Sequence, residues 1–367
     1  MKTLAEIDPN FQVDAIVPAS AVFFDPREAP CSIWGLAPNE ERTFCRLPLS
    51  MLPECSEGVQ RLAFHLAGGC VRFSTDSDYL AVLWELPQGG TMGHFTACGE
   101  RGMALYTESD EGARQVKTLI PQMRPEGGCQ LQQTSLIPLP GGMRHYALYL
   151  PLYSGLSSLL LGIAPDAQML PGRTPALEKP LVFYGSSITQ GGCAATAGAC
   201  YPALLARRLD AAQINLGFSG NAKGEASMAR YIAGLDMSAF IFDYDHNAPD
   251  AAHLRATHAP FFQIVRQAQP RLPIVMVSRP DFDREPGPAR ERRQVILETY
   301  MNALAAGDRH VYFVDGEGLF GNRNREECTV DGCHPTNLGF LRMADGIEPV
   351  LRRALAEREK ADIQASK

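Results

Sequence analysis

The chain has 367 residues, more than one ordinary hydrophobic core takes, so its length predicts two domains. Its formal net charge of -7, without a long basic run, argues against nucleic acid as a partner. No stretch approaches the roughly 18 apolar residues of a membrane-spanning helix, and residues 1–9 do not resemble a signal peptide. We therefore expect a cytoplasmic protein without a membrane partner; no pattern predicts its oligomeric state.

The 10 cysteines do not predict a metal site. They form no Cys-x-x-Cys pair, and no Cys/His run has the spacing of a structural zinc site. The histidines likewise show no metal-ligand spacing. We expect reduced thiols, no bound metal and no cofactor.

Residues 1–175 predict a β-sandwich of jelly-roll type followed by a linker. Short apolar runs, separated by turn residues, recur with little helical periodicity. The clearest predicted strands are 71–75, 79–86, 102–106, 145–150 and 159–163. Many short strands at this spacing are typical of a sandwich, and the four prolines within 165–180 indicate the linker.

The linker also predicts how the two domains are joined. Prolines stiffen a connection, whereas glycine and serine repeats would let a domain wander. We therefore expect the sandwich to form a fixed interface and to shape the active site. The loops at Trp34-Gly35 and at Arg46-Leu47-Pro48 are the candidates for that contact, with Trp34 a candidate substrate-binding residue.

Residues 176–367 predict a three-layer α/β/α domain with a parallel five-stranded sheet. Apolar strands alternate with helical segments along this half of the chain. The predicted strands are 181–184, 214–217, 239–244, 273–277 and 311–314.

The first of these strands runs into Gly185, after which the chain carries Ser186 and Ser187 and then small residues up to Gly192. A strand that stops so sharply presents its next side chain at the carboxyl edge of the sheet, where open α/β folds place their chemistry. A glycine-punctuated turn with capping serines is the structural alternative. We predict Ser187 as a nucleophile.

Polar residues that follow the other strands complete an acyl-transfer site. His334 is the predicted general base, and Asp331, three residues earlier, is predicted to orient its imidazole. The backbone N–H groups of Ser187 and Gly220, with the Asn247 side-chain amide, are predicted oxyanion donors. His246, Arg279 and Asp281 fall at the same edge and are candidate substrate-binding residues.

These residues resemble the hallmark blocks of the SGNH (GDSL-type) hydrolases over residues 181–350. The blocks are 185–189 with Ser187, 217–221 with Gly220, Asn247, and 331–335 with His334. The N-terminal half is similar to the jelly-roll-like domain that precedes a bacterial branch of this family. The resemblance implies esterase or acylhydrolase activity without metal or cofactor.

Three positions depart from the family pattern. Ser186 stands where an acidic residue usually precedes the nucleophile, and Asp245-His246-Asn247 replaces the Gly-x-Asn-Asp block. In the Gly-x-Asp-Leu-Tyr signature of the N-terminal branch, Ala104 stands in place of the acid. None of these changes removes the nucleophile, the base or the oxyanion donors.

We expect a serine esterase that removes small, acetyl-like acyl groups from a carbohydrate or glycoside, a substrate class that rests on analogy. A lipid or thioester acylhydrolase and a non-catalytic carbohydrate-binding protein are the alternatives. A flavodoxin-like nucleotide binder is disfavoured because residues 185–192 fit neither Gly-x-Gly-x-x-Gly nor a P-loop. An α/β-hydrolase is disfavoured because no Gly-x-Ser-x-Gly surrounds Ser187.

Overall fold

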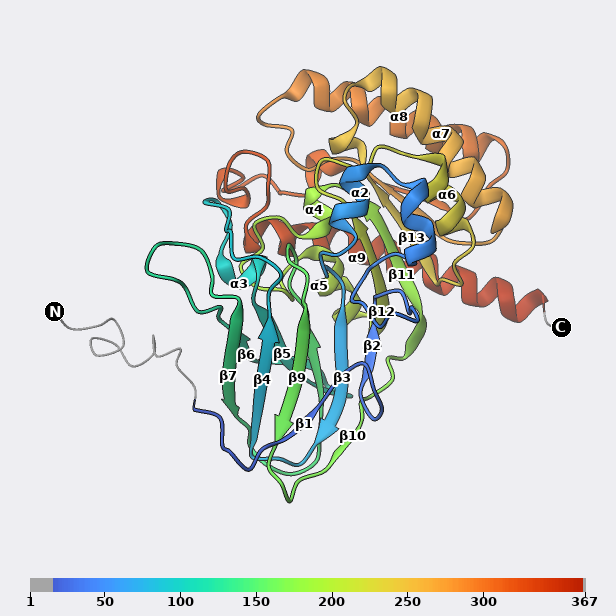
Figure 1. Ribbon diagram of the computed structural model, residues 1–367. Coiled ribbons are helices and arrows are strands. Elements are labelled where there is room, and N and C mark those ends of the chain that lie inside the picture. The colour runs from blue at the N-terminus through green and yellow to red at the C-terminus, as the bar shows by residue number, and fades with distance from the viewer. Residues whose placement is uncertain (1–15, 366–367) are drawn as a thin grey trace.

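The computed structural model describes residues 16–365, so the predicted lack of a signal peptide at residues 1–9 lies outside the described residues. Figure 1 shows a β-rich N-terminal half beside a half in which helices cover a parallel sheet. Among the described residues, no helix has the length and apolar character needed to cross a lipid bilayer.

The N-terminal half contains two antiparallel sheets that enclose a shared hydrophobic core, and it is called the sandwich below. One sheet has the order β1 (Val22–Phe24), β9 (Ser158–Ile163), β4 (Tyr79–Glu85), β7 (Gln132–Pro138). The other has the order β10 (Met169–Pro171), β3 (Cys70–Thr75), β8 (Arg144–Tyr149), β5 (Met103–Ser109), β6 (Gly112–Leu119), and β2 (Ser32–Trp34) also pairs with β3. The jelly-roll topology stays a prediction.

The sandwich holds elements that its sequence did not reveal. Strand β6 is largely exposed and polar, and β1, β2 and β10 have three residues each, so none carries a strong apolar pattern. The predicted linker 165–180 is shorter than expected, because β10 pairs with β3 and β11 (Leu177–Gly185) has already begun. Three short helices, η2 (Leu49–Glu54), α2 (Glu57–Leu62) and α3 (Ala97–Glu100), interrupt the strands.

The C-terminal half confirms the predicted three-layer α/β/α fold. Its five-stranded parallel sheet has the order β12 (Ala211–Gly217), β11, β13 (Ala239–Asp243), β14 (Ile274–Val277), β15 (Val311–Val314). In chain order this is 2-1-3-4-5, so β11 and β13 flank the point where the direction of winding reverses. Open α/β sheets bind their ligands at this point, beyond the carboxyl ends of the strands.

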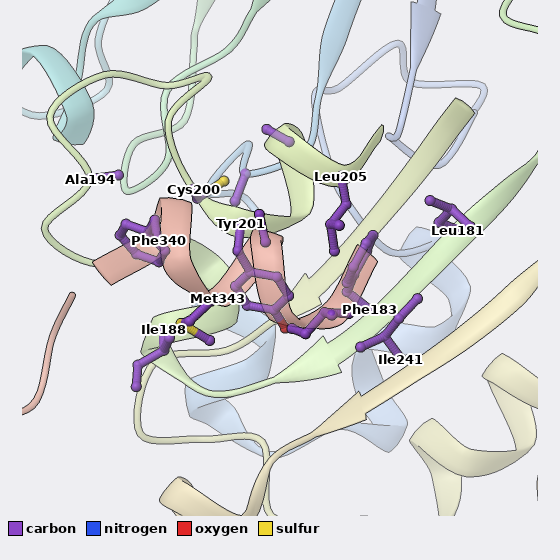
Figure 2. Packing of buried hydrophobic residues seen from close by; sticks show 14 of the residues in the cluster. Leu181, Phe183, Ile188, Ala194, Cys200, Tyr201, Leu205, Ile241, Phe340 and Met343 are labelled. Carbon is purple, nitrogen blue, oxygen red and sulfur yellow. The ribbon is translucent and has the colours of Figure 1, made fainter. Parts of the chain in front are cut away.

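Alternate residues of each strand cover opposite faces of the sheet, as strand geometry requires. Leu181 and Phe183 of β11 face α5 (Tyr201–Arg208) and α9 (Asn337–Ala365), and Figure 2 shows part of this core. Val182 and Tyr184 share the opposite core with α6 (Ala226–Ala233), α7 (Ala251–Ala268) and α8 (Pro286–Ala305). The sheet is thus buried on both sides, which fixes the positions of its strand ends.

Both cores of the α/β half extend into the sandwich. On β5, Met103 and Leu105 face the sandwich interior, whereas Ala104 and Tyr106 join the core that contains Tyr201 of α5. On the opposite face, the segment with η2 and α2 packs against the core beside α6, and Figure 1 shows this segment in blue next to α6. The two halves therefore share continuous hydrophobic cores.

Candidate active site

The turn after β11 places Ser187 at the switch point of the sheet. A Cβ at Gly185 would lie 2.0 Å from the Thr189 hydroxyl and 2.3 Å from the Asp243 carbonyl, so glycine is required there. The Ser186 hydroxyl accepts a hydrogen bond from the Ile188 N–H and caps the short helix α4 (Ser187–Gln190). Ser187 is the first residue of that helix and keeps 7% of its surface exposed.

A chain of hydrogen bonds joins Ser187 to His334 and Asp331. Ser187 Oγ lies 2.9 Å from His334 Nε2, and His334 Nδ1 lies 2.8 Å from Asp331 Oδ2. Because a carboxylate only accepts, Nδ1 carries the proton in this pairing and Nε2 is left to accept from the serine hydroxyl. The arrangement has the geometry of a nucleophile, a base and a group that orients the base.

The loop before α9 fixes this arrangement locally. Asp331 Oδ1 accepts hydrogen bonds from the backbone N–H groups of Cys333 and His334, at 3.0 and 2.8 Å. Gly332 has a φ of 80°, which lets the chain turn back on the carboxylate. The same carboxylate therefore shapes the loop and holds the imidazole.

The surroundings shift the pKa values of Asp331 and His334 in the directions that favour a carboxylate–imidazolium ion pair. Burial raises the pKa of Asp331, but hydrogen bonds from His334 and Cys333 outweigh it and lower the pKa to about 2. Hydrogen bonding to Cys333, opposed by burial and supported by Asp331, raises the pKa of His334 to about 9. The imidazolium that forms when His334 takes a proton is thus stabilised.

The predicted oxyanion donors lie at neighbouring strand ends. The Ser187 N–H is at the first position of a helix, where it has no partner inside the helix. Gly220 has a φ of 68°, and a Cβ there would point into open space. Asn247 ends the 3-10 helix η3 (Asp245–Asn247) after β13, and its side-chain amide donates to the Phe218 carbonyl at 2.8 Å.

Residues that sequence reasoning did not assign to this site hold these elements in place. Tyr153 of the sandwich donates its hydroxyl hydrogen to the Ser187 carbonyl at 3.1 Å. Gln190 accepts from the Ser219 N–H at 2.9 Å and donates to the Leu152 carbonyl at 3.1 Å. Buried Arg292 donates to the carbonyls of Asp245 and Ala248, on either side of Asn247. Each joins segments distant in sequence, so no local pattern could reveal it.

The sandwich reaches the site at two further places. The centroid of the His94 ring lies 5.8 Å from that of the His334 ring. The backbone carbonyl of His94 accepts a hydrogen bond from the Cys193 thiol. Helix α2 approaches the Gly220 loop so closely that a Cβ at Gly58 would lie 1.8 Å from the side chain of Asn221.

Three of the four candidate substrate-binding residues form a cluster beside His334. Arg279 pairs with Asp281 through two hydrogen bonds, of 2.9 and 2.6 Å, and both side chains are buried. His246 Nε2 lies 3.1 Å from Asp281 Oδ2 and 3.3 Å from Cys333 Sγ. The side chains of these three residues thus contact one another, and their substrate-binding role stays a prediction.

Trp34 lies apart from this cluster. On β2, its indole N–H donates to the Ser32 hydroxyl at 3.0 Å, and the Arg72 guanidinium lies over its ring. These are contacts of the sandwich, so the structure does not bring Trp34 together with Ser187. Both predicted loops nevertheless reach the α/β half at β12. A Cβ at Gly35 would lie 3.0 Å from the Gln213 carbonyl, and buried Arg46 donates to the carbonyls of Asn215 and Gly217 at the end of β12.

Two family models match this chain in succession. Residues 21–169 match the N-terminus of SGNH-hydrolase-type esterases, and residues 178–352 match the GDSL-like lipase/acylhydrolase family. No curated protein matches the sequence.

Several solved structures share the whole architecture. A protein described as a GDSL-like lipase from Bacteroides ovatus is 28% identical, with a TM-score of 0.82 over 92% of this chain and 98% of its own. A salicylyl-acyltransferase from a tetracycline biosynthetic pathway is 19% identical, with a TM-score of 0.71 over 93% and 98%. An acetyl xylan esterase from Butyrivibrio proteoclasticus is 14% identical, with a TM-score of 0.59 over 92% and 99%.

The last two structures are too distant in sequence to show more than a common fold. The two family models lie end to end across both halves, however, and agree with the α/β/α sheet and the preceding sandwich. The chain therefore belongs to the SGNH (GDSL-type) hydrolase family, in the branch with this N-terminal domain, and is a carboxylester hydrolase.

Proposed function

We propose that Ser187, His334 and Asp331 are the catalytic triad of a serine esterase. The observation that supports this assignment most is the continuous path from Ser187 Oγ through both imidazole nitrogens to the Asp331 carboxylate. Asp331 holds the imidazole in the tautomer that accepts from the serine, and it stabilises the imidazolium.

In the first half of the reaction, Ser187 Oγ attacks the ester carbonyl carbon while Nε2 of His334 takes the hydroxyl proton. The tetrahedral oxyanion is stabilised by the N–H groups of Ser187 and Gly220 and by the Asn247 amide. His334 returns the proton to the leaving alcohol, and an acyl-enzyme remains. Water, activated by the same imidazole, then releases the carboxylic acid and regenerates Ser187.

The substrate we propose is an ester of a small, acetyl-like acyl group on a carbohydrate or glycoside. The groups that surround Ser187 and His334 include the His94 ring, the Cys193 and Cys333 thiols and the backbone of Gly192. The common fold with an acetyl xylan esterase is consistent with this class. A lipid or thioester substrate is the alternative.

Hydrolysis of p-nitrophenyl esters of increasing acyl length tests this proposal. We expect kcat/KM to be highest for acetate and to fall steadily toward octanoate, and acetylated sugars to release acetate. A maximum at eight carbons or longer would overturn the substrate class but leave the triad standing. Equal activity of the wild type and Ser187→Ala on every ester would overturn the triad.

A further inference from the structure

The cluster of His246, Asp281 and Cys333 brings three metal-ligating side chains together from three separate segments. His246 belongs to η3 after β13, Asp281 follows β14, and Cys333 lies in the loop before α9. Their ligand atoms lie within 4.8 Å of one another. Residues so far apart in sequence have no spacing pattern, which explains why the cysteine and histidine count predicted no metal site.

The three ligand atoms converge instead of forming a relay. In a Cys-His-Asp relay, the imidazole would contact the thiol through one nitrogen and the carboxylate through the other. Here the same nitrogen, Nε2 of His246, faces both Asp281 Oδ2 at 3.1 Å and Cys333 Sγ at 3.3 Å. A ring nitrogen that lies this close to two other electron-pair donors needs a proton or a cation between it and them.

Two of the three separations between these atoms are close to those around a four-coordinate metal ion, and the third, from Asp281 Oδ2 to Cys333 Sγ, is within 4.8 Å. Zinc bond lengths of about 2.3 Å to sulfur and about 2.0 Å to nitrogen place tetrahedral ligand atoms roughly 3.5 Å apart. The observed separations of 3.1 and 3.3 Å would have to open by only a few tenths of an ångström. Thiolate, imidazole and carboxylate are also the ligand types that zinc takes in proteins.

The charges and the supporting residues fit a divalent ion. Arg279 holds the Asp281 carboxylate through two hydrogen bonds, as a partner outside the ligand shell commonly does. Cys333 as thiolate, Asp281 and Arg279 sum to one negative charge. His246 keeps part of its side chain exposed, so an ion has a path to the cluster.

We propose that His246 Nε2, Asp281 Oδ2 and Cys333 Sγ form a site for a divalent transition-metal ion of the Zn²⁺ or Co²⁺ type, with a fourth position open to water. The ion replaces the proton that His246 shares with the other two groups. Hydrolysis itself uses no metal. Because Cys333 and His246 directly precede His334 and Asn247, occupancy displaces the base and an oxyanion donor and lowers the esterase activity. This second consequence rests on the proposed function.

Cobalt absorption tests the site directly, without any measurement of activity. Metal-free, reduced full-length protein is titrated with Co²⁺ under anaerobic conditions. We expect a sulfur-to-cobalt charge-transfer band in the near ultraviolet that saturates at one ion per chain and that Zn²⁺ abolishes. Cys333→Ser should lose the band. Asp281→Asn should weaken binding by more than the roughly 10–100-fold typical for loss of an outer-shell partner.

Cys193→Ser is the matched control, because Cys193 lies beside the same active site in a second group with His94 and His334. This variant should keep the band, and thermal unfolding should show that each variant is folded. The absence of a charge-transfer band at saturating Co²⁺, or its persistence in Cys333→Ser, would overturn the proposed site.

The effect on activity is a separate measurement. Zn²⁺ should lower the esterase activity of the wild type and leave that of Cys333→Ser at its own metal-free value. The wild type could bind Co²⁺ with the expected band and yet hydrolyse esters equally well with and without Zn²⁺. That result would overturn the proposed inhibition but not the proposed metal site. If the esterase assignment itself were wrong, metal-free protein would show no Ser187-dependent hydrolysis, whereas the cobalt spectrum would still decide the site.

Discussion

At the scale of single residues, three serines lie close to the strand end, and their contacts distinguish them. Ser187 contacts the His334 imidazole, Ser186 caps α4, and the Ser219 N–H is bonded to Gln190. Of these three, only Ser187 has its hydroxyl paired with a base. These contacts thus distinguish Ser187, the proposed nucleophile, from neighbours that have structural contacts.

Replacing Ser187 with alanine should abolish turnover while leaving the fold intact. The loss removes one hydroxyl from a partly exposed position, and we expect kcat/KM on p-nitrophenyl acetate to fall by about 10⁴-fold or more. Ser219→Ala is the control and should stay within about tenfold of the wild type. Near-normal turnover of Ser187→Ala would show that another residue is the nucleophile.

The pH dependence of kcat/KM reports the protonation of His334 in the free, metal-free enzyme. An imidazole acts as a base only when neutral, so activity rises with pH through the pKa of His334. From the sequence alone, this rise is expected between the acid side of neutrality and near-neutral pH. In the structure, the hydrogen bond to Cys333 and the neighbouring Asp331 raise the pKa of His334 to about 9, although burial opposes the shift. We therefore expect the activity to rise in the alkaline range.

Cys333→Ala should move this rise to lower pH, because it removes the largest cause of the raised pKa of His334. A pH titration of kcat/KM for the two proteins measures the shift. Identical profiles would show that the Cys333 thiol does not influence the base.

At the scale of elements, Gln190 connects three structures that must keep their relative positions. It belongs to α4 with Ser187, its side-chain oxygen accepts from Ser219 in the oxyanion loop, and its amide donates to Leu152 of the sandwich. A buried polar side chain with all these bonds is costly to replace, since each partner left unsatisfied costs about 1–3 kcal/mol.

Gln190→Ala should therefore lower kcat by up to about 100-fold with little change in KM, because the oxyanion donors shift and the substrate contacts do not. Steady-state kinetics separates the two parameters. His65→Ala, which removes the contact of the Gln190 amide with His65 and the ring contact of His65 with Tyr153 but leaves the bonds of Gln190 to Ser219 and Leu152, is the control and should keep most of the activity. A change in KM alone would instead indicate that Gln190 binds substrate.

At the scale of the whole molecule, the sandwich is built into the α/β half and is not an appendage. Arg46 is the clearest example, because its buried guanidinium donates to Asn215, Gly217 and Leu62 carbonyls and lies over the Phe218 ring. Burial lowers the pKa of Arg46 to about 9, so the group stays charged at neutral pH.

Arg46→Met should destabilise the protein by about 3 kcal/mol or more, since three buried carbonyl groups lose a partner. The free energy of unfolding from denaturant titration measures this loss. Arg42→Ala is the control from the same loop, and its exposed ion pair with Glu28 should contribute only about 0–1 kcal/mol. Equal stability of Arg46→Met and Arg42→Ala would show that the contact contributes little.

For the same reason, residues 176–367 expressed alone should be insoluble or inactive. The fragment exposes the apolar faces that Tyr106, Tyr149 and Met51 cover in the full chain, and it loses the Tyr153 contact with Ser187. Solubility and turnover of the fragment are the measurements. A soluble fragment with full activity would show that the α/β half does not need the shared cores to fold or to work.

The sequence predicted those parts of the molecule that local patterns encode. Apolar runs, two of them stopped by glycine, revealed the five parallel strands, and the Asp331 to His334 spacing predicted the pairing of this imidazole with its carboxylate. Contacts between distant segments left no local trace. The bonds of Gln190, the contact of Tyr153 with the Ser187 carbonyl and the convergence of Cys333 with His246 therefore emerged only from the fold. Trp34 contacts Ser32 and Arg72 of the sandwich because its strand pairs with β3.

Covalent labelling tests the central claim most directly, because it identifies the nucleophile without assuming a substrate. The metal-free protein is treated with a fluorophosphonate, and the modified peptide is sequenced by mass spectrometry. The proposed triad predicts one adduct on Ser187, formed faster as His334 loses its proton and absent in Asp331→Asn under the same short exposure. An adduct on Ser186, Ser219 or Cys333 instead, or none on the active wild type, would contradict it.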